Sequence, residues 1–184
     1  MKKQETNLIL DYALSNSENL RIALLICEQY SNLRRVIVDK FEQQVCEELR
    51  QRCGKEWQID PRSFFKAEEG IRLLKPAWKG KFDICVAADS SDATDIFVGV
   101  KNYFSSNQGK DGRLFCELNK HFRQGKVGSS WEWYAYLEQY RDWNSADILV
   151  ALHDDRAVVD EIVYQLCRIQ TVSEPIIDEY VSRA

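Results

Sequence analysis

Three short extended runs between Glu69 and Asn102 constrain the fold of this chain more than any other feature. They cover Ile71–Lys75, Phe82–Ala88 and Ile96–Val100. In the second run, Phe82, Ile84, Val86 and Ala88 alternate with the residues between them, which is typical of a strand with one buried face. The segment Ser90-Ser91-Asp92 then supplies a turn. The sequence therefore predicts an antiparallel hairpin at the centre of the molecule.

Helical sequence precedes this hairpin. From Glu18 to Cys53 there is no Gly or Pro, and apolar residues recur three or four positions apart. Asn16 or Ser17 can cap the start of the helix, and Ser31-Asn32 is expected to divide it into two. Trp57–Asp60 follows as a candidate fourth strand, which Pro61 ends.

Further helices are expected after the hairpin. Their ranges are Leu114–Phe122, Trp131–Tyr140, Ala157–Arg168 and Ile176–Val181, the last beginning after Ser173-Glu174-Pro175. The run Ile148–Leu152 fits a helix or a strand, because five apolar residues have no diagnostic period.

These elements predict an α+β fold with a small, mostly antiparallel sheet of three to four strands flanked by N-terminal and C-terminal helices. The sequence indicates a single domain over residues 1–184, with residues 1–54 helical, 55–102 forming the sheet and 103–184 helical again.

Composition excludes several classes of protein. The longest uncharged apolar run, Ile22–Cys27, is too short to cross a bilayer, and the N-terminus lacks signal-peptide features. The sequence therefore predicts a cytoplasmic protein with no membrane partner. None of the six cysteines forms a CxxC pair and there are only two histidines, so we expect buried free thiols, no metal site and no cofactor.

A family resemblance adds to this interpretation. The phrase Gly70-Ile71-Arg72-Leu73 with Trp78-Lys79, the strand ending Phe97-Val98-Gly99-Val100 and the later tryptophan-rich segment resemble the region downstream of the nuclease core in certain bacterial PD-(D/E)XK proteins. The likeness covers about Phe41 to Val181. The resemblance implies a bacterial or phage origin, but this accessory region contributes no catalytic residue that can be transferred to the chain.

Nuclease chemistry of the PD-(D/E)XK type is the alternative that the resemblance raises. It needs one acid at a strand end, then an acid and a lysine two residues apart on the next strand, which together hold and use Mg²⁺. Lys101 stands where such a lysine would be, with Asp83 or Asp95 as the first acid and Glu117 as a substitute from the following helix. The position two residues before Lys101 is Gly99, so the motif is incomplete and the sequence favours a non-enzyme.

A basic and aromatic segment is the candidate binding surface. Its residues are Arg113, Lys120, Arg123, Lys126, Trp131 and Tyr134. Cations beside stacking aromatic rings suit single-stranded nucleic acid. The net charge of −4 counts against such a partner, because phosphate binding depends on an excess of Lys and Arg.

The sequence therefore predicts a non-catalytic interaction module that binds another protein. Immunity and antitoxin-type proteins fit this description, since a small acidic chain can neutralise a basic toxin by charge complementarity. A degenerate metal-dependent nuclease and a nucleic-acid-binding module are the alternatives.

Overall fold

The computed structural model describes residues 2–104, 112–122 and 125–183, with the backbone alone for residues 2–7. The chain forms two compact units, Met1–Ile37 and Val38–Ala184, which we call unit 1 and unit 2. Each is described by itself below. The single domain expected over residues 1–184 stays a prediction.

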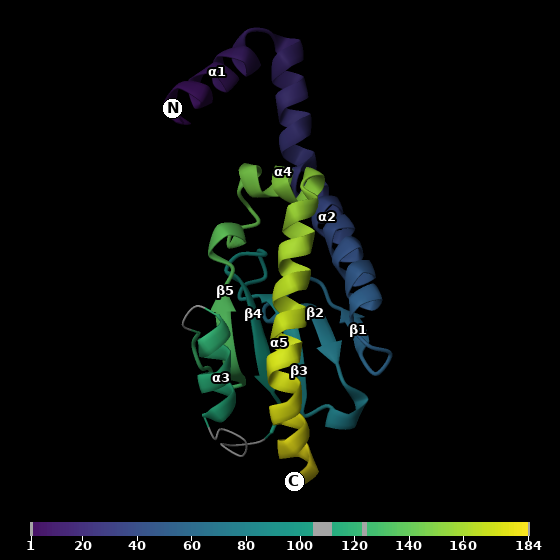
Figure 1. Cartoon of the computed structure of the whole chain (residues 1–184). Helices are drawn as coiled ribbons and strands as arrows, with labels where there is room; N and C mark the ends of the chain where they lie inside the picture. The colour runs from purple at the N-terminus through teal and green to yellow at the C-terminus, as the bar shows by residue number, and fades with distance from the viewer. Residues whose placement is uncertain (1, 105–111, 123–124, 184) are drawn as a thin grey trace. The chain divides into compact units, whose positions relative to one another are not determined.

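Unit 1 consists of helix α1 (Lys2–Leu14) and the first part of helix α2 (Ser17–Arg52) (Figure 1). Asn16 begins α2 as the sequence predicted, because its side-chain oxygen accepts a hydrogen bond from the backbone N–H of Asn19 at 2.9 Å. The expected break at Ser31-Asn32 is wrong, and the helix runs through it. The Asn32 amide donates to the side chain of Gln29 at 3.0 Å instead of competing for the backbone.

Unit 2 is built on a five-stranded antiparallel sheet with strand order β1-β2-β3-β4-β5 (Figure 1). Its strands are β1 (Gln58–Pro61), β2 (Glu69–Leu74), β3 (Phe82–Ala88), β4 (Ile96–Asn102) and β5 (Trp131–Tyr136). The α+β class and the hairpin of β3 and β4 are thus confirmed. The sheet has one strand more than the upper end of the predicted three to four.

Strand β5 corrects the helix expected over Trp131–Tyr140. The six residues of this strand, WEWYAY, pair with β4. The chain then makes a 3₁₀ turn, η2 (Glu138–Tyr140). Aromatic side chains favour strands, and a strand sends them alternately to its two faces. A single helix face could not bury all of these aromatic side chains.

The remaining helices are η1 (Pro76–Trp78), α3 (Arg113–His121), α4 (Ala146–Asp154) and α5 (Arg156–Arg183). The ambiguous run within 148–152 is therefore helical. The two helices expected over Ala157–Arg168 and Ile176–Val181 are one, with Pro175 inside it. Pro175 removes one backbone hydrogen bond, but the next turn is fixed by Asp178, which accepts bonds from the Lys75 ammonium at 2.6 Å and the Trp78 indole at 2.7 Å.

The core of unit 2 lies between the sheet and its helices. Helix α5 crosses the sheet and packs on β3 and β4 (Figure 1), and the ring of Tyr180 meets that of Phe82 at 5.9 Å. The second part of α2 contributes a buried row that includes Phe41, which lies 5.4 Å from the ring of Trp143. Burial of these large apolar side chains is the main source of stability in such a unit.

Candidate functional site

One face of the sheet carries a mixed set of polar and aromatic side chains, which we call the polar–aromatic face. Strand pairing places its residues in three rows across the sheet: Asp83, Lys101 and Trp131; Arg72, Cys85, Gly99 and Tyr134; and Ala87, Phe97 and Tyr136. The alternation of strand side chains puts the predicted pair Asp83 and Lys101 directly opposite each other.

The buried carboxylate of Asp83 is the centre of the polar part. It accepts a hydrogen bond from the Tyr103 hydroxyl at 2.7 Å and lies 3.5 Å from the guanidinium of Arg72. Arg72 also reaches Glu69 at 3.2 Å, and the Lys101 ammonium donates to Glu68 at 2.7 Å. Each charged group here has a partner of opposite charge, as buried charges require.

Burial raises the pKa of Asp83, while the hydrogen bond from Tyr103 and the charges of Arg72 and Lys101 act in the opposite direction. Burial and the bond to Asp83 raise the pKa of the Tyr103 hydroxyl, so it stays a proton donor at neutral pH. The cluster therefore holds one buried acid, and the Oδ2 atom of Asp83 is engaged by both the Tyr103 hydroxyl and the Arg72 guanidinium.

The other two nuclease candidates lie elsewhere. Asp95 is in the turn between β3 and β4, where its carboxylate pairs with Arg141 at 2.5 Å. Glu117 is on α3, where it pairs with Lys120 at 2.6 Å. Of the four predicted acid and lysine residues, the structure thus brings together Asp83 and Lys101 and gives Asp95 and Glu117 separate partners.

The structure explains why glycine occupies position 99, where the second acid of a nuclease motif would be. A Cβ atom there would lie 2.7 Å from the backbone oxygen of Trp133 and 2.9 Å from the Cβ of Tyr134, both on β5. Because backbone atoms cannot give way as a flexible side chain can, any side chain at this position would displace β5. The close pairing of β4 and β5 therefore requires glycine.

The cysteines and the residue types that bind metals are the remaining candidates for chemistry. Within the part of the chain that the structure describes, no three His, Cys, Asp or Glu side chains form a group able to hold a metal ion. All six cysteines are free, but Cys27 and Cys116 are exposed, contrary to the expected burial of every thiol. A hydrogen bond from Cys53 lowers the pKa of Cys167 to about 7.

The aromatic part of the polar–aromatic face is a small cluster around Phe97. Its ring meets those of Trp131 at 4.8 Å, Tyr134 at 5.5 Å and Tyr136 at 6.2 Å, mostly edge to face. Trp131 is buried and Tyr134 is half-buried. The predicted binding residue Lys126 places its ammonium 4.8 Å from the ring of Tyr136.

The other predicted basic residues lie apart from this cluster. Arg113 and Lys120 are on α3 and pair with Glu179 at 2.5 Å and Glu117 at 2.6 Å. Arg123 lies outside the described residues. The described members of the set are thus divided between α3 and the sheet, and the two on α3 are neutralised by acids.

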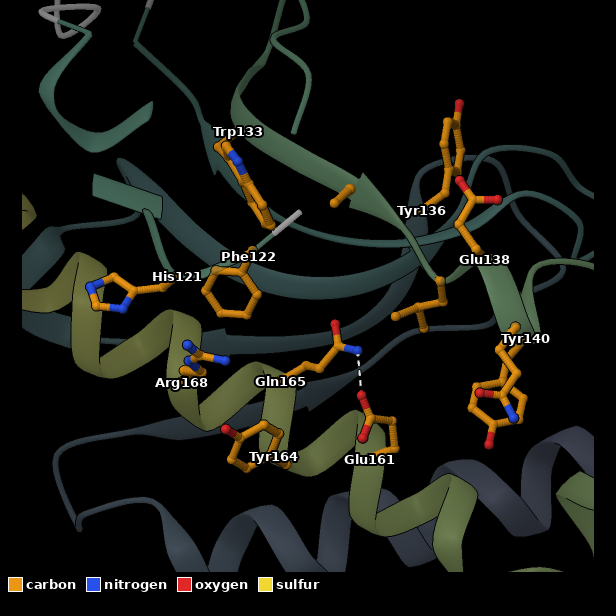
Figure 2. A pocket seen from close by; sticks show the side chains of 13 residues that line it. His121, Phe122, Trp133, Tyr136, Glu138, Tyr140, Glu161, Tyr164, Gln165 and Arg168 are labelled. Atoms are coloured by element: carbon orange, nitrogen blue, oxygen red, sulfur yellow. Dashed lines mark hydrogen bonds between the residues drawn. The ribbon is translucent and has the colours of Figure 1, made fainter. Parts of the chain in front are cut away.

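A groove of about 660 Å³ lies beside β5 (Figure 2). Figure 2 shows Phe122, His121 and Arg168 at one end, and Glu138 and Tyr140 at the other. Its lining comes from the end of α3, from β5 with the turn that follows, and from α5. None of the sequence-predicted site residues lines it. Because the sequence predicted a helix over 131–140, it gave no indication of a groove beside a strand.

Unit 1 has the largest apolar surface. Seventeen large hydrophobic side chains are exposed among the described residues, and thirteen of them lie between residues 8 and 36. They are Leu8, Ile9, Leu10, Tyr12, Leu14, Leu20, Ile22, Leu24, Leu25, Ile26, Tyr30, Leu33 and Val36, each between 40% and 69% exposed. A folded monomeric protein rarely exposes so many large apolar side chains, so unit 1 is a candidate interaction surface.

The sequence predicted helices over these apolar residues and did not identify them as an exposed surface. The signal was the run Ile22–Cys27, because a helix that is apolar on every side needs neighbours on more than one side. None of the described helices has the length and apolar character needed to span a membrane.

Comparison with known proteins gave no relative: no family model, no curated protein and no solved structure matches this chain.

Proposed function

We propose that this chain is a non-catalytic interaction module that acts through protein–protein contact. The observation that supports it is the apolar surface of unit 1, where Ile26 is 61% exposed and Leu33 is 54% exposed. Burying the exposed half of one such side chain against a partner contributes about 1–2 kcal/mol. A surface of thirteen such residues therefore favours binding to another protein.

The charge distribution supports the same proposal. The first 37 residues contain five of the chain's 25 basic residues and four of its 29 acidic residues, so the acidic excess lies in unit 2. An acidic unit favours fast association with a basic partner. We therefore propose an immunity or antitoxin-type role, in which a basic protein is bound and neutralised.

Capture on immobilised protein tests the proposal. A bacterial lysate is passed over the wild-type chain and over the variant Ile26→Glu/Leu33→Glu, and the matched control is Val150→Glu, which changes an exposed apolar residue of unit 2. We expect a protein that the wild type and the control retain and the double variant loses. Its binding is then measured by calorimetry with the purified components. Equal retention on all three columns would reject a contact through unit 1.

A metal-dependent nuclease is the second candidate, and the pairing of Asp83 with Lys101 across β3 and β4 favours it. Asp83 would be the metal-binding acid and Lys101 the residue that orients the attacking water, as the resemblance to PD-(D/E)XK proteins implies. The test is Mg²⁺- or Mn²⁺-dependent DNA cleavage that is lost in Asp83→Asn and in Lys101→Met. Cleavage that survives both substitutions would come from a contaminant.

Nucleic-acid binding without cleavage is the third candidate, and the place of Lys126 beside Tyr136 favours it. Retention of single-stranded DNA should then weaken steeply with salt and fall in Lys126→Ala. The acidic charge of unit 2 opposes this reading, so we rank it below the other two.

A further inference from the structure

The apolar surface of unit 1 contains a regular stripe on α2. Ala23, Ile26, Tyr30, Leu33 and Ile37 follow one another at alternating steps of three and four residues. This spacing is the heptad pattern by which one helix packs along another. Ile26, Tyr30 and Leu33 are each at least 40% exposed.

The stripe continues along the helix into the buried row that α2 contributes to the core of unit 2. Phe41 and Val45, which are buried, follow Ile37 at steps of four residues. Phe41 is 1% exposed, whereas Leu33 is 54% exposed. The apolar face of α2 is therefore longer than the part that the core of unit 2 buries, and the stripe is its exposed part.

The width of the stripe indicates how many helices it meets. Three of the five positions that flank the seam, Ile22, Cys27 and Val36, are apolar, and the other two are Gln29 and Arg34, whereas a two-stranded coiled coil carries charges at most of these positions. A wider apolar face is typical of a helix in a four-helix bundle. Helix α1 presents its own pair, Leu8 and Tyr12, four residues apart and both more than 60% exposed.

We infer that the partner of this surface is a second copy of the chain, and that α1 and residues 17–37 of α2 from two copies form a four-helix bundle. The inference rests on the proposed function in one respect, that unit 1 makes a protein contact. It adds the identity of the partner and the type of interface, a symmetric one in which the same patch serves both copies.

Charge and area both favour self-association. Unit 1 has five basic and four acidic residues, so it is nearly neutral and two copies do not repel each other. A surface that binds a strongly charged partner would instead carry a net charge opposite to that of the partner. Without Leu24 and Leu25, which lie off the stripe, eleven exposed apolar side chains remain. The exposed half of each is worth about 1–2 kcal/mol, or roughly 40–80 Å² at about 25 cal/mol per Å², so together they supply roughly 440–880 Å² per chain. A stable interface buries about 800 Å² on each side, so these side chains supply at least about half of it.

Analytical ultracentrifugation of the full chain tests this inference. The wild type should sediment with twice the monomer mass of 21.5 kDa over a wide concentration range. The variant Ile26→Ala/Leu33→Ala removes two side chains of the stripe from each copy and should weaken the dimer by at least about a hundredfold. Alanine is the best helix former, so this loss cannot come from melting of α2.

Leu24→Ala/Leu25→Ala is the matched control, because it removes equally exposed side chains of the same helix that lie off the stripe. It should leave the dimer constant nearly unchanged. All five tryptophans are in unit 2, so their fluorescence checks that every variant keeps that unit folded.

Several outcomes would overturn the inference. They are a wild type that remains monomeric at all concentrations, a control pair that weakens the dimer as much as the stripe pair, and a monomer that floats with lipid vesicles. A monomeric wild type that still captures a foreign protein through Ile26 and Leu33 would reject the second copy and leave the proposed function standing. A dimeric wild type that captures no foreign protein would support the second copy as the partner and reject the capture of a foreign protein through unit 1.

Discussion

Units 1 and 2 place their apolar side chains in opposite ways. In unit 2, Trp78, Trp133 and Trp143 are fully buried and the exposed apolar residues are few and scattered. In unit 1, large side chains such as Leu8 and Leu14 are more than two-thirds exposed. A surface left in water forgoes the free energy that burial supplies. The comparison teaches that unit 2 holds a core of its own, whereas most of the large apolar side chains described in unit 1 lie outside any such core.

Helix α2 makes the comparison sharp, because it supplies residues to both units. Phe41 is 1% exposed and Leu33, two turns earlier, is 54% exposed, although both are large apolar residues of the same helix. Local helix propensity is therefore similar at the two positions, and the packing around each decides what its side chain contributes.

The largest expected effect uses this pair. Phe41→Ala should lower the free energy of unfolding of unit 2 by about 3–5 kcal/mol, because it leaves a cavity beside Trp143. Leu33→Ala should change it by less than about 0.5 kcal/mol. Urea denaturation followed by tryptophan fluorescence measures both, at concentrations low enough to keep the chain monomeric. Similar losses in the two variants would show that unit 1 is not open as described.

A smaller effect is expected at Gly99. Gly99→Ala should cost about 1–3 kcal/mol, since its Cβ would meet the backbone of β5. Gly54→Ala is the control, because the nearest atoms there belong to the flexible end of Glu56, which can move away. Thermal unfolding compares them. If Gly99→Ala were as stable as Gly54→Ala, the structural reason given for the missing nuclease acid would be wrong.

The smallest effect is a pH dependence at Glu42, a partly buried residue of α2 in unit 2. Burial, followed by the nearby charge of Asp39, raises the pKa of Glu42 from 4.5 to about 7. The folded state then binds the proton more tightly than the unfolded state, so stability is highest below pH 4.5 and falls as pH rises through 7. Glu42→Gln removes the charge and should therefore be more stable than the wild type by about 1–2 kcal/mol at pH 8, with no such gain at pH 4.5.

Glu47→Gln is the matched control for that measurement, since Glu47 is exposed on the same helix. Its stability difference from the wild type should stay flat from pH 4.5 to 8. A flat difference for Glu42→Gln as well would mean that its carboxyl is hydrated in the folded state.

Much of the sheet could be predicted from local patterns. The alternation in Phe82–Ala88, the polar turn after it and the return in Ile96–Val100 identified the central hairpin, because strand period and turn chemistry act over few residues. Strand β5 was missed because WEWYAY was interpreted as part of a helix, and the residues that it pairs with on β4 are 30 to 39 positions earlier in the chain. The groove beside it was missed for the same reason.

The candidate site was predictable only in part. The sequence offered Asp83 or Asp95 as the acid to accompany Lys101, and the register of β3 with β4 pairs Asp83 with Lys101. Their engagement with Tyr103 and Glu68 depends on side chains that arrive from other segments, and no spacing in the sequence reports it.

The sequence by itself determined the α+β class, the central hairpin and the helical character of residues 17–52, because these depend on periodicity, capping and turns that act between near neighbours. Tertiary structure alone decided which apolar residues are core and which are surface. The stripe from Ala23 to Ile37 and the row that begins with Val38 have the same spacing in the sequence. They differ in what lies against them, because burial depends on contacts between segments distant in the chain.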